Sequence, residues 1–344
     1  MIHLVHKFLH RYVNKLWYSS PSIGNLLLLP FSVIYQFVIL TRKYIYQKYF
    51  LSSTQINAPV IVVGNITVGG TGKTPFVIWL VEFLIQKGYR PGIISRGYGG
   101  KGAIYPLQVQ LDSDVTIVGD EAVLLKRRTS CPVVISPNRI QALQYLKKNT
   151  NCNIVVSDDG LQHYKLPRQI EIVIVDGERM FGNEYCLPAG PLREPMSRLE
   201  TVDFIIINGG EHFSFEDKNV FPMKLSQKDF YNIVTPELKG TYEDFLSQPI
   251  HVVAGIGNPE RFFQSLIQQG MSIQAHEFPD HYVYKENDLN FHHDKECRII
   301  MTEKDAVKCE SFADYRYWCA RVDAQLTEDL EVALLQKLKT LLGN

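Results

Sequence analysis

The stretch that decides the fold lies between residues 60 and 75 and reads Val60-Ile61-Val62-Val63-Gly64-Asn65-Ile66-Thr67-Val68-Gly69-Gly70-Thr71-Gly72-Lys73-Thr74-Pro75. Its first four residues are branched and apolar, which predicts a short buried strand. A glycine-rich loop follows, and a helical pattern of apolar residues begins at Pro75. A strand, a glycine-rich loop, Lys-Thr and a helix in this order predict a P-loop that binds phosphate groups.

The residue types of this loop suit a nucleotide. Glycines allow successive backbone N–H groups to point at phosphate oxygens, and the helix N-terminus adds a positive dipole end. Lys73 can neutralise the β- and γ-phosphates, and the Thr74 hydroxyl can coordinate Mg²⁺. Thr67 stands where the usual motif has its first glycine, and the competing interpretation is a glycine-rich turn with an incidental lysine. The predicted ATP-binding residues are Gly69, Gly70, Thr71, Gly72, Lys73 and Thr74.

Short apolar runs alternate with helical segments on both sides of this loop, which predicts a parallel sheet with helices on both faces. The fold class expected is therefore α/β, similar to P-loop NTPases, with a smaller C-terminal α/β subdomain and an N-terminal membrane-associating segment. The expected strands are 60–63, 92–95, 133–136, 154–157, 170–175 and 204–207, then 250–254, 272–278, 298–301 and 318–322. The expected helices are 75–87, 121–127, 138–148, 259–269 and 326–342.

These patterns divide the chain into three predicted parts. Residues 1–50 form the membrane-associating segment, residues 51–245 the P-loop core, and residues 246–344 the smaller subdomain. Two short apolar runs within 208–245 suggest a ribbon that links the core to the subdomain.

Two carboxylates follow one of the core strands. Asp158 and Asp159 end the apolar run 154–157, the position at which P-loop proteins carry an acid that organises the metal and its water. An Asp-Asp-Gly sequence alone can also form a turn. The P-loop about ninety residues earlier favours a Mg²⁺ site.

The N-terminal segment is basic and apolar. No acidic residue precedes Glu82, and residues 4–17 have helical spacing with an apolar stripe opposite a basic face. The apolar run 26–40 is about fifteen residues long, whereas a spanning helix needs about 20. An interfacial anchor is the favoured interpretation; a short spanning helix and a helix packed on the core are the alternatives, and partial insertion of the second run stays open. No signal-peptide cleavage site follows.

The amino-acid composition further narrows the classes of protein and of partner to expect. An apolar content of 45% with 21% charged residues is typical of a globular chain. The net charge of zero gives no reason to expect nucleic acid as a partner, and nothing in the sequence implies an obligate protein partner. The six cysteines contain no C-x-x-C pair, which favours reduced core thiols in a cytosolic protein over disulfides or zinc.

A series of motifs then resembles one family, the tetraacyldisaccharide 4'-kinases. They are SRGYGG at 95–100, GDE at 119–121, DDGLQH at 158–163, LPAGPLREP at 187–195, AGIGNPERF at 254–262, PDH at 279–281 and TEKDAVK at 302–308. The resemblance covers roughly residues 10 to 340. It implies transfer of the ATP γ-phosphoryl group to the 4'-hydroxyl of a tetraacyl glucosamine disaccharide 1-phosphate, giving lipid IV-A in lipid A synthesis. It also implies Mg²⁺ and the cytoplasmic face of the bacterial inner membrane.

The resemblance also implies residue roles. Asp120 and His281 match a catalytic acid–histidine pair, in which the carboxylate accepts the hydroxyl proton and the histidine orients it. Their structural alternatives are a helix N-cap for Asp120 and a loop or core histidine for His281. Lys73 completes the predicted catalytic set. The metal set is Thr74, Asp159, Asp158 and Glu194, and the substrate set is Arg96, Tyr98, Gln162, His163 and Arg193. Arg139, Lys304 and Asp305 lie in family-like segments without an assigned role.

Two rival functions belong to other classes. A nucleotide-switch ATPase or GTPase, or a metallochaperone, at the membrane surface would use the same loop, but it would need a protein partner and no sugar acceptor. A non-enzymatic nucleotide-binding module would give no reason for the match at Asp120 and His281. Transfer of labelled phosphate to the lipid distinguishes all three.

Overall fold

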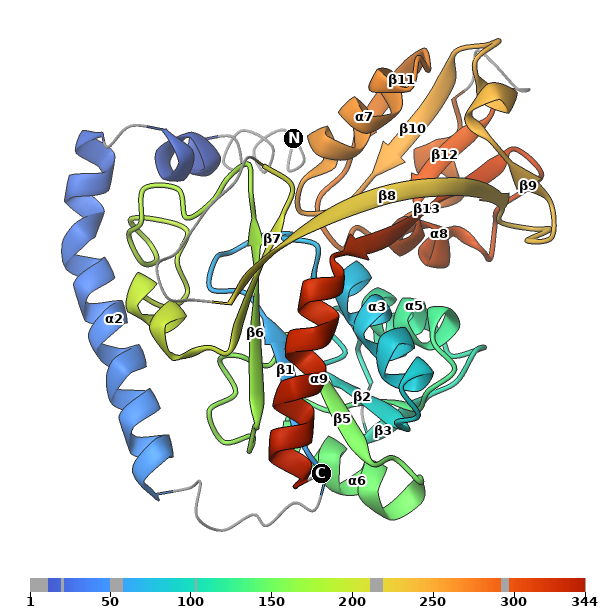
Figure 1. The fold of residues 1–344 in the computed structure, drawn as a ribbon. Helices are drawn as coiled ribbons and strands as arrows, with labels where there is room; N and C mark the ends of the chain where they lie inside the picture. The colour runs from blue at the N-terminus through green and yellow to red at the C-terminus, as the bar shows by residue number, and fades with distance from the viewer. Residues whose placement is uncertain are drawn as a thin grey trace.

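One mixed sheet runs through the whole protein, of which this computed structural model describes residues 12–19, 22–49, 58–102, 104–210, 219–291 and 297–343. The sheet has 13 strands in the order β11-β10-β12-β13-β8-β7-β6-β1-β5-β2-β4-β3, and β9 pairs with β8 alongside this path (Figure 1). We call the part around β1 the first lobe and the part around β10 the second lobe.

The first lobe contains the predicted parallel sheet. Its parallel strands are β1 (Val60–Gly64), β2 (Pro91–Ser95), β4 (Val133–Ile135), β5 (Ile154–Asp158), β6 (Ile170–Asp176) and β7 (Phe204–Asn208), and β3 (Leu107–Val109) adds an antiparallel edge. The helices are α3 (Lys73–Gln86), α4 (Val115–Val118), α5 (Asp120–Arg128) and α6 (Arg139–Asn149). Strands and helices expected from the sequence are confirmed here to within two residues.

Alternating side chains of β1 serve two hydrophobic cores. Ile61 and Val63 pack under α3 and α5 on one face, and Val60 and Val62 pack near α6 on the other. Because both faces are covered, every residue of β1 is buried and the strand is apolar throughout.

The second lobe is a smaller parallel sheet. Its strands are β10 (Ile250–Ala254), β11 (Ile273–Glu277) and β12 (Ile299–Thr302), with β9 (Lys239–Gly240), and its helices are α7 (Pro259–Gln268) and α8 (Glu303–Cys309). The strand β13 (Tyr317–Leu326) pairs parallel with β12 and leads into α9 (Glu328–Leu342).

The structure adds a detail to the predicted linking ribbon. Its two apolar runs lie largely in a single strand of 13 residues, β8 (Val220–Asn232). This strand pairs parallel with β7 and antiparallel with β13, so it connects the two lobes within one continuous sheet. The reversal of strand direction at β8 and β13 lets the carboxyl ends of β1 and β10 meet: at that edge, the loop after β10 touches the P-loop at Gly257 and Gly70.

The boundary predicted at residue 246 stays a prediction, and the structure adds a complication to it. Helix α9 follows the second lobe in sequence but packs over the first lobe (Figure 1). Leu330, Leu334 and Leu338 belong to the same core as Phe76 of α3. The last segment of the chain therefore stabilises the lobe that begins the chain.

The N-terminal segment differs from its expected length. The amphipathic helix was expected over residues 4–17; residues 12–18 are helical, and residues 4–11 lie outside the described residues. The second run was expected to be about fifteen residues long, but α2 (Ile23–Tyr49) has 27 residues and continues through Pro30 and past Leu40. Among the described residues, Ile23–Tyr46 is long and apolar enough to cross a membrane, with 24 residues and a mean hydropathy of 2.0.

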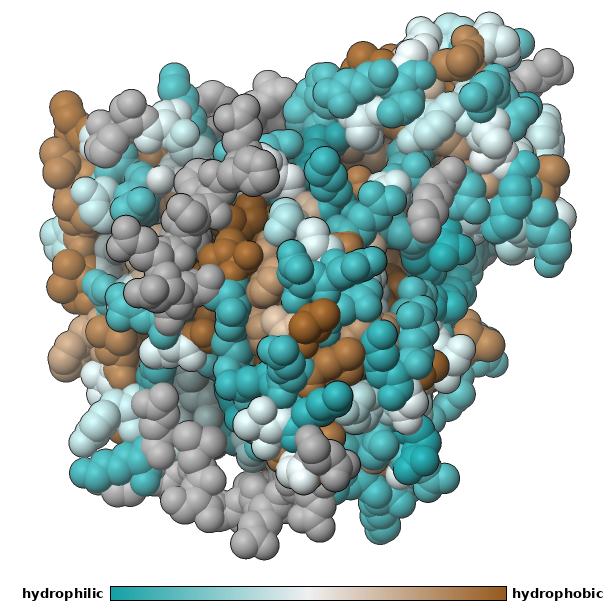
Figure 2. Space-filling model, in the orientation of Figure 1, coloured by the Kyte–Doolittle hydropathy of each residue, from teal (hydrophilic) through white to brown (hydrophobic). Residues whose placement is uncertain are grey.

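Helix α2 contacts the rest of the protein through both polar and apolar groups. Asn25 Nδ2 donates to the Ala189 carbonyl at 2.9 Å, Ser32 Oγ to the Cys186 carbonyl at 2.6 Å, and Tyr35 OH to the Arg193 carbonyl at 3.2 Å, while Tyr35 also packs against the hydrophobic core. Its outward side is apolar, as the brown edge beside this helix in Figure 2 shows. The exposed apolar and aromatic residues of α2 are Ile23, Leu26, Leu27, Phe31, Val33, Ile34, Phe37, Val38, Leu40, Tyr44 and Ile45.

Candidate active site

The glycine-rich loop lies at the carboxyl edge of the first-lobe sheet. Gly69 and Gly72 have φ of 102° and 90°, which residues with a side chain rarely adopt. A Cβ on Gly72 would lie 2.5 Å from Asn208 Nδ2, so this position requires glycine for space as well. Thr67, the departure from the motif, pairs antiparallel with Leu192 as an isolated bridge. This bridge requires an extended backbone at residue 67, and threonine fits that conformation.

The segment around Leu192 supports the loop from one side. Val68 N–H donates to the Pro191 carbonyl at 2.9 Å, and Arg193 N–H donates to the Ile66 carbonyl at 2.6 Å. On the other side, Asn208 Nδ2 donates to the Thr71 carbonyl at 3.0 Å. These contacts hold the loop's backbone before any ligand is present.

Asp158 and Asp159 end β5 beside the loop, and their environments differ. Asp159 is partly exposed and has φ of 48°, and its carboxylate lies 3.4 Å from Lys73 Nζ and 3.4 Å from Arg193. Burial raises the pKa of Asp159, but these cations lower it more, to about 2. Asp158 is buried and accepts a hydrogen bond from Ser95 Oγ at 3.3 Å. Burial, together with the carboxylates of Glu121 and Asp159, raises the pKa of Asp158 to about 7.

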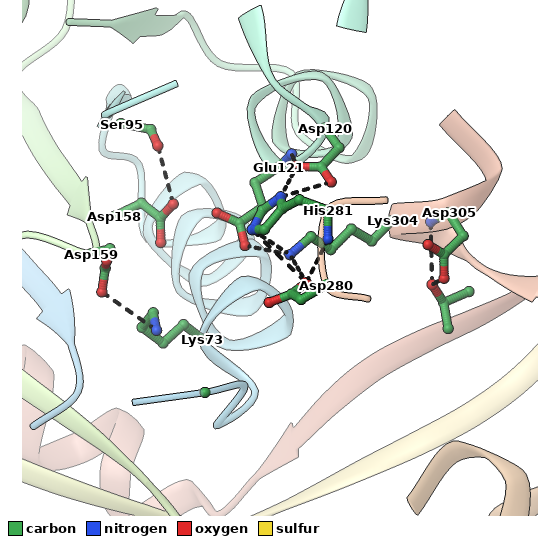
Figure 3. Close-up of polar contacts among 12 residues, drawn as sticks. Lys73, Ser95, Asp120, Glu121, Asp158, Asp159, Asp280, His281, Lys304 and Asp305 are labelled. Atoms are coloured by element: carbon green, nitrogen blue, oxygen red, sulfur yellow. Dashed lines mark hydrogen bonds and ion pairs between the residues drawn. The ribbon is translucent and has the colours of Figure 1, made fainter. Parts of the chain in front are cut away.

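The structure brings Asp120 and His281 together from opposite lobes (Figure 3). Asp120 is the first residue of α5, with Gly119 as N-cap, so the capping alternative does not describe it. His281 Nδ1 lies 3.0 Å from each carboxylate oxygen of Asp120, and Lys308 Nζ lies 3.8 Å from Oδ2. Burial raises the pKa of Asp120, but His281 and the nearby lysines outweigh it and hold the pKa below its usual value.

A cavity of about 1100 Å³ opens between the lobes. Among the predicted site residues, those that line it are Gly69, Gly70, Thr71, Gly72, Lys73, Thr74, Arg96, Tyr98, Asp159, Arg193 and His281. Asp120 is 3% exposed and lies behind His281, and Glu121 presents the neighbouring carboxylate to the cavity. The Tyr98 ring packs on His281 with a centroid distance of 4.6 Å, so this loop contacts the pair directly.

Glu194 and Gln162 belong to a separate polar cluster that does not line the cavity, and His163 and Asp158 do not line it either. Glu194 is 1% exposed, and its carboxylate accepts hydrogen bonds from Gln162 at 2.7 Å, Tyr164 at 2.8 Å and Arg198 at 3.1 Å. Gln162 also donates to the Asn65 carbonyl at 3.1 Å. Burial and four nearby arginines lower the pKa of His163 to about 4. In this structure Glu194 and Gln162 brace the loop rather than face the cavity.

Sequence reasoning missed several polar residues that line the cavity. Asp176 and Asn208 end β6 and β7, and Arg179 and Arg261 contact them. Arg179 also donates to the Gly70 carbonyl of the P-loop. The signal that identified Asp158 and Asp159, a polar residue directly after an apolar strand, was present at both Asp176 and Asn208.

Hard oxygen ligands near the loop fit Mg²⁺. Within the described ranges, no group of three or more His, Cys, Asp or Glu side chains is placed to hold a metal ion. Mg²⁺ is usually bound by one or two carboxylates together with substrate phosphates. The Thr74 hydroxyl and the Asp159 carboxylate line the cavity and are oxygen groups of this kind, whereas the buried Asp158 carboxylate does not line it.

Comparison with known proteins agrees with this geometry. The family described as tetraacyldisaccharide-1-P 4'-kinase matches residues 24–339. Tetraacyldisaccharide 4'-kinases of Nitrosococcus oceani and Methylobacillus flagellatus are 48% and 46% identical to the chain, covering 94% and 96% of it and 94% and 97% of their own lengths. The crystal structure of "apo" form LpxK from Aquifex aeolicus in complex with ATP is 26% identical, with a TM-score of 0.76, covering 92% of this chain and 99% of that one. The chain therefore belongs to the tetraacyldisaccharide-1-P 4'-kinase family.

Proposed function

We propose that this ATP-dependent kinase phosphorylates the 4'-hydroxyl of a tetraacyl disaccharide 1-phosphate with Asp120 as the proton acceptor. The γ-phosphoryl group of ATP is transferred directly, and the product is the lipid IV-A intermediate of lipid A synthesis. The observation that carries the residue assignment is the contact between Asp120 and His281, because His281 lines the same cavity as the P-loop.

The chemistry supports this assignment of the base. A sugar hydroxyl is a poor nucleophile, and a carboxylate within reach can accept its proton as the new bond forms. The pKa of Asp120 lies below its usual value, so the group is ionised and able to accept a proton at neutral pH. His281 orients the carboxylate by contacting both of its oxygens. Because Asp120 is buried behind His281, the proposal requires the lipid hydroxyl to enter between α5 and the 279–281 loop.

Nucleotide and metal are assigned to the opposite side of the cavity. Gly69 to Thr74 bind the phosphates, and Lys73 neutralises their charge. Thr74, Asp158 and Asp159 would hold Mg²⁺, which supplies charge neutralisation on the phosphate oxygens when bound. Arg96 and Tyr98 are proposed to contact the lipid head group because they line the same cavity as His281. Gln162, His163 and Glu194 stay predictions.

The test of the base compares two adjacent carboxylates. Asp120→Ala should lower kcat by about 10²–10⁴-fold while ATP binding stays largely intact. Glu121→Gln removes the carboxylate that lines the cavity and should lower kcat much less. Radiolabelled ATP and the tetraacyl disaccharide 1-phosphate are incubated with each variant, and labelled lipid is measured. Near-normal turnover by Asp120→Ala, or a greater loss in Glu121→Gln, contradicts the assignment.

The apolar side of α2 supports a position on the cytoplasmic face of the inner membrane. Hydrogen bonds hold the helix to the protein and many of its outward residues are apolar, so lipid is the solvent that suits its surface. Basic residues Arg42, Lys43 and Lys48 at its carboxyl end suit an anionic head-group region. Residues 1–20 are proposed to add an interfacial anchor.

Vesicle pelleting tests the two membrane elements separately. Deleting residues 1–20 should weaken pelleting with anionic vesicles, and Phe31→Asp with Phe37→Asp should weaken it through α2. Glu331→Gln on the exposed side of α9 is a matched surface control and should leave pelleting unchanged. If the deletion variant pellets as well as the full-length protein, the anchor at residues 1–20 is ruled out, whereas the proposal for α2 is unaffected.

A further inference from the structure

The ammonium group of Lys304 contacts both His281 and the loop that carries this histidine. Its Nζ lies 3.1 Å from Glu121 Oε1, 3.0 Å from Asp280 Oδ1 and 3.1 Å from His281 Nε2 (Figure 3). An ammonium group has three hydrogens and no lone pair, so these three contacts use its full donor capacity. Lys304 is the second residue of α8, which begins directly after β12, and the mechanism above gives this segment no role.

The contact with His281 determines which ring nitrogen carries the hydrogen. A lysine ammonium can only donate, so Nε2 must accept and cannot itself bear a hydrogen. The neutral ring then carries its hydrogen on Nδ1, and Nδ1 faces both oxygens of Asp120 at 3.0 Å. The hydrogen bond that one ring nitrogen of a histidine makes commonly determines which nitrogen carries the hydrogen.

The same ammonium group also fixes the backbone that presents the ring. His281 has φ of 59°, a left-handed conformation that a residue with a side chain rarely adopts. Its N–H donates to Asp280 Oδ1 at 3.1 Å, and that oxygen also accepts from Lys304. Lys304 is 15% exposed by its side chain, and the carboxylates around it raise its pKa although burial lowers it. It is therefore a permanent cation at the pH of the cell.

We propose that Lys304 is a positioning residue that holds His281 as the neutral Nδ1–H tautomer and so directs that hydrogen to Asp120. The inference rests on the proposed function of the Asp120–His281 pair and deepens it, because it assigns the proton acceptor to Asp120 alone. With Nε2 occupied by Lys304, His281 has no free nitrogen with which to take the hydroxyl proton. The charged groups around the ring are Asp120 and Glu121 of α5, Asp280 of its own loop, and Lys304 and Lys308 of α8.

The experiment measures the tautomer of His281 and the turnover of the full-length protein separately. Ring-¹⁵N-labelled histidine is followed by NMR, and the His281 signals are identified by their loss in His281→Gln. In the unaltered protein the attached hydrogen is expected on Nδ1. Lys304→Met should move the hydrogen to Nε2 or charge the ring, and should lower kcat at least about tenfold with the KM for ATP within about twofold. Lys304→Arg retains a donor and should restore the tautomer and part of kcat.

Glu310→Gln serves as the matched structural control. It removes the pair with Arg127 between α5 and α8 without touching His281, and it should change neither the tautomer nor kcat. An Nε2-bound hydrogen in the unaltered protein overturns the proposal, even if Lys304→Met does not fold. So does a change in only one of the two readouts in Lys304→Met, or an equal loss of kcat in Glu310→Gln. Failure of the proposed function would appear differently: His281→Gln would turn over normally, while the unaltered protein would still carry the hydrogen on Nδ1.

Discussion

Removing Arg128 should destabilise the contact between the lobes far more than removing its neighbour Arg127. Arg128, at the end of α5, donates to both carboxylate oxygens of Glu303 at 2.6 and 2.7 Å and also contacts Asp323 of β13. The side chains of Arg128 and Glu303 are 11% and 8% exposed. Arg127 pairs with Glu310 across the same interface, but these side chains are 30% and 37% exposed.

The magnitude follows from this difference in exposure. Two unit charges 2.6 Å apart attract by about 6 kcal/mol at an effective dielectric constant of about 20. Much of this is offset by desolvation, and removal of one partner of a buried pair costs about 3–5 kcal/mol because the other charge stays buried. Arg128→Met should therefore lower the free energy of unfolding by about 3 kcal/mol. Arg127→Met should lower it by less than about 1 kcal/mol, as for exposed pairs.

The loss of unfolding free energy in Arg128→Met should also depend on pH. Burial raises the pKa of Glu303 in the native protein despite the pairing, and without Arg128 it should rise further. A raised pKa of an acid means that the folded protein binds more protons than the unfolded chain between the two pKa values. Stability in that window falls as pH rises, by up to about 1.4 kcal/mol per pH unit. Lowering the pH from about 7.5 towards the unfolded pKa should thus restore part of the lost stability.

Urea unfolding of the purified protein in detergent, followed by tryptophan fluorescence at several pH values, measures both effects. The reasoning would be refuted by equal losses in Arg128→Met and Arg127→Met. It would be refuted equally by a loss in Arg128→Met that does not shrink as pH falls. Glu303→Gln combined with Arg128→Met removes the unpaired charge and should be more stable than Arg128→Met alone.

Three further predictions concern the P-loop and the core. Gly257→Val places a side chain where a Cβ lies 2.2 Å from Gly70 N, so it should raise the KM for ATP several-fold, and an unchanged KM would show that this contact opens on binding. Lys73→Met should weaken ATP binding in a fluorescent-nucleotide titration and leave the melting temperature within a few degrees, because the lost pair with Asp159 is partly exposed. Phe76→Ala removes a fully buried ring and should lower the free energy of unfolding by about 3–5 kcal/mol, whereas a loss under 1 kcal/mol would mean that the core refills the space.

Local patterns were enough to predict the parallel strands of both lobes and helices α3, α5, α6, α7 and α9, but not β3, β9, α4 or α8. The P-loop and the position of Asp158 and Asp159 follow from a strand ending in polar residues, a signal contained within a few residues. The contact between Asp120 and His281 spans 161 residues, and no local rule places them together. It was expected only because the chain resembles a family, and the structure confirms the contact itself.

Long-range packing explains the expectations that failed. The sequence of β8 shows two apolar runs because Ser226 to Asp229 between them are polar, yet these residues still pair with β13 or lie between its partners. The apolar run of α2 ends at Leu40, but the helix continues, since exposed Arg42 and Lys48 are compatible with a helix. The buried cluster around Glu194 depends on Tyr164 and Arg198, which no motif joined to it.

Finally, the chain crosses between the lobes twice, both times as a strand, in β8 and in β13. No loose connecting loop is present among the described residues at either crossing. Any change in the spacing of the lobes must then be taken up as torsion of a two-stranded ribbon, which can twist without giving up its ladder of hydrogen bonds. The ribbon would return Lys304 and His281 of the second lobe to the same position relative to Asp120 of the first lobe after each turnover. Amide exchange in β8 and β13 should consequently stay slow even when the cavity is open.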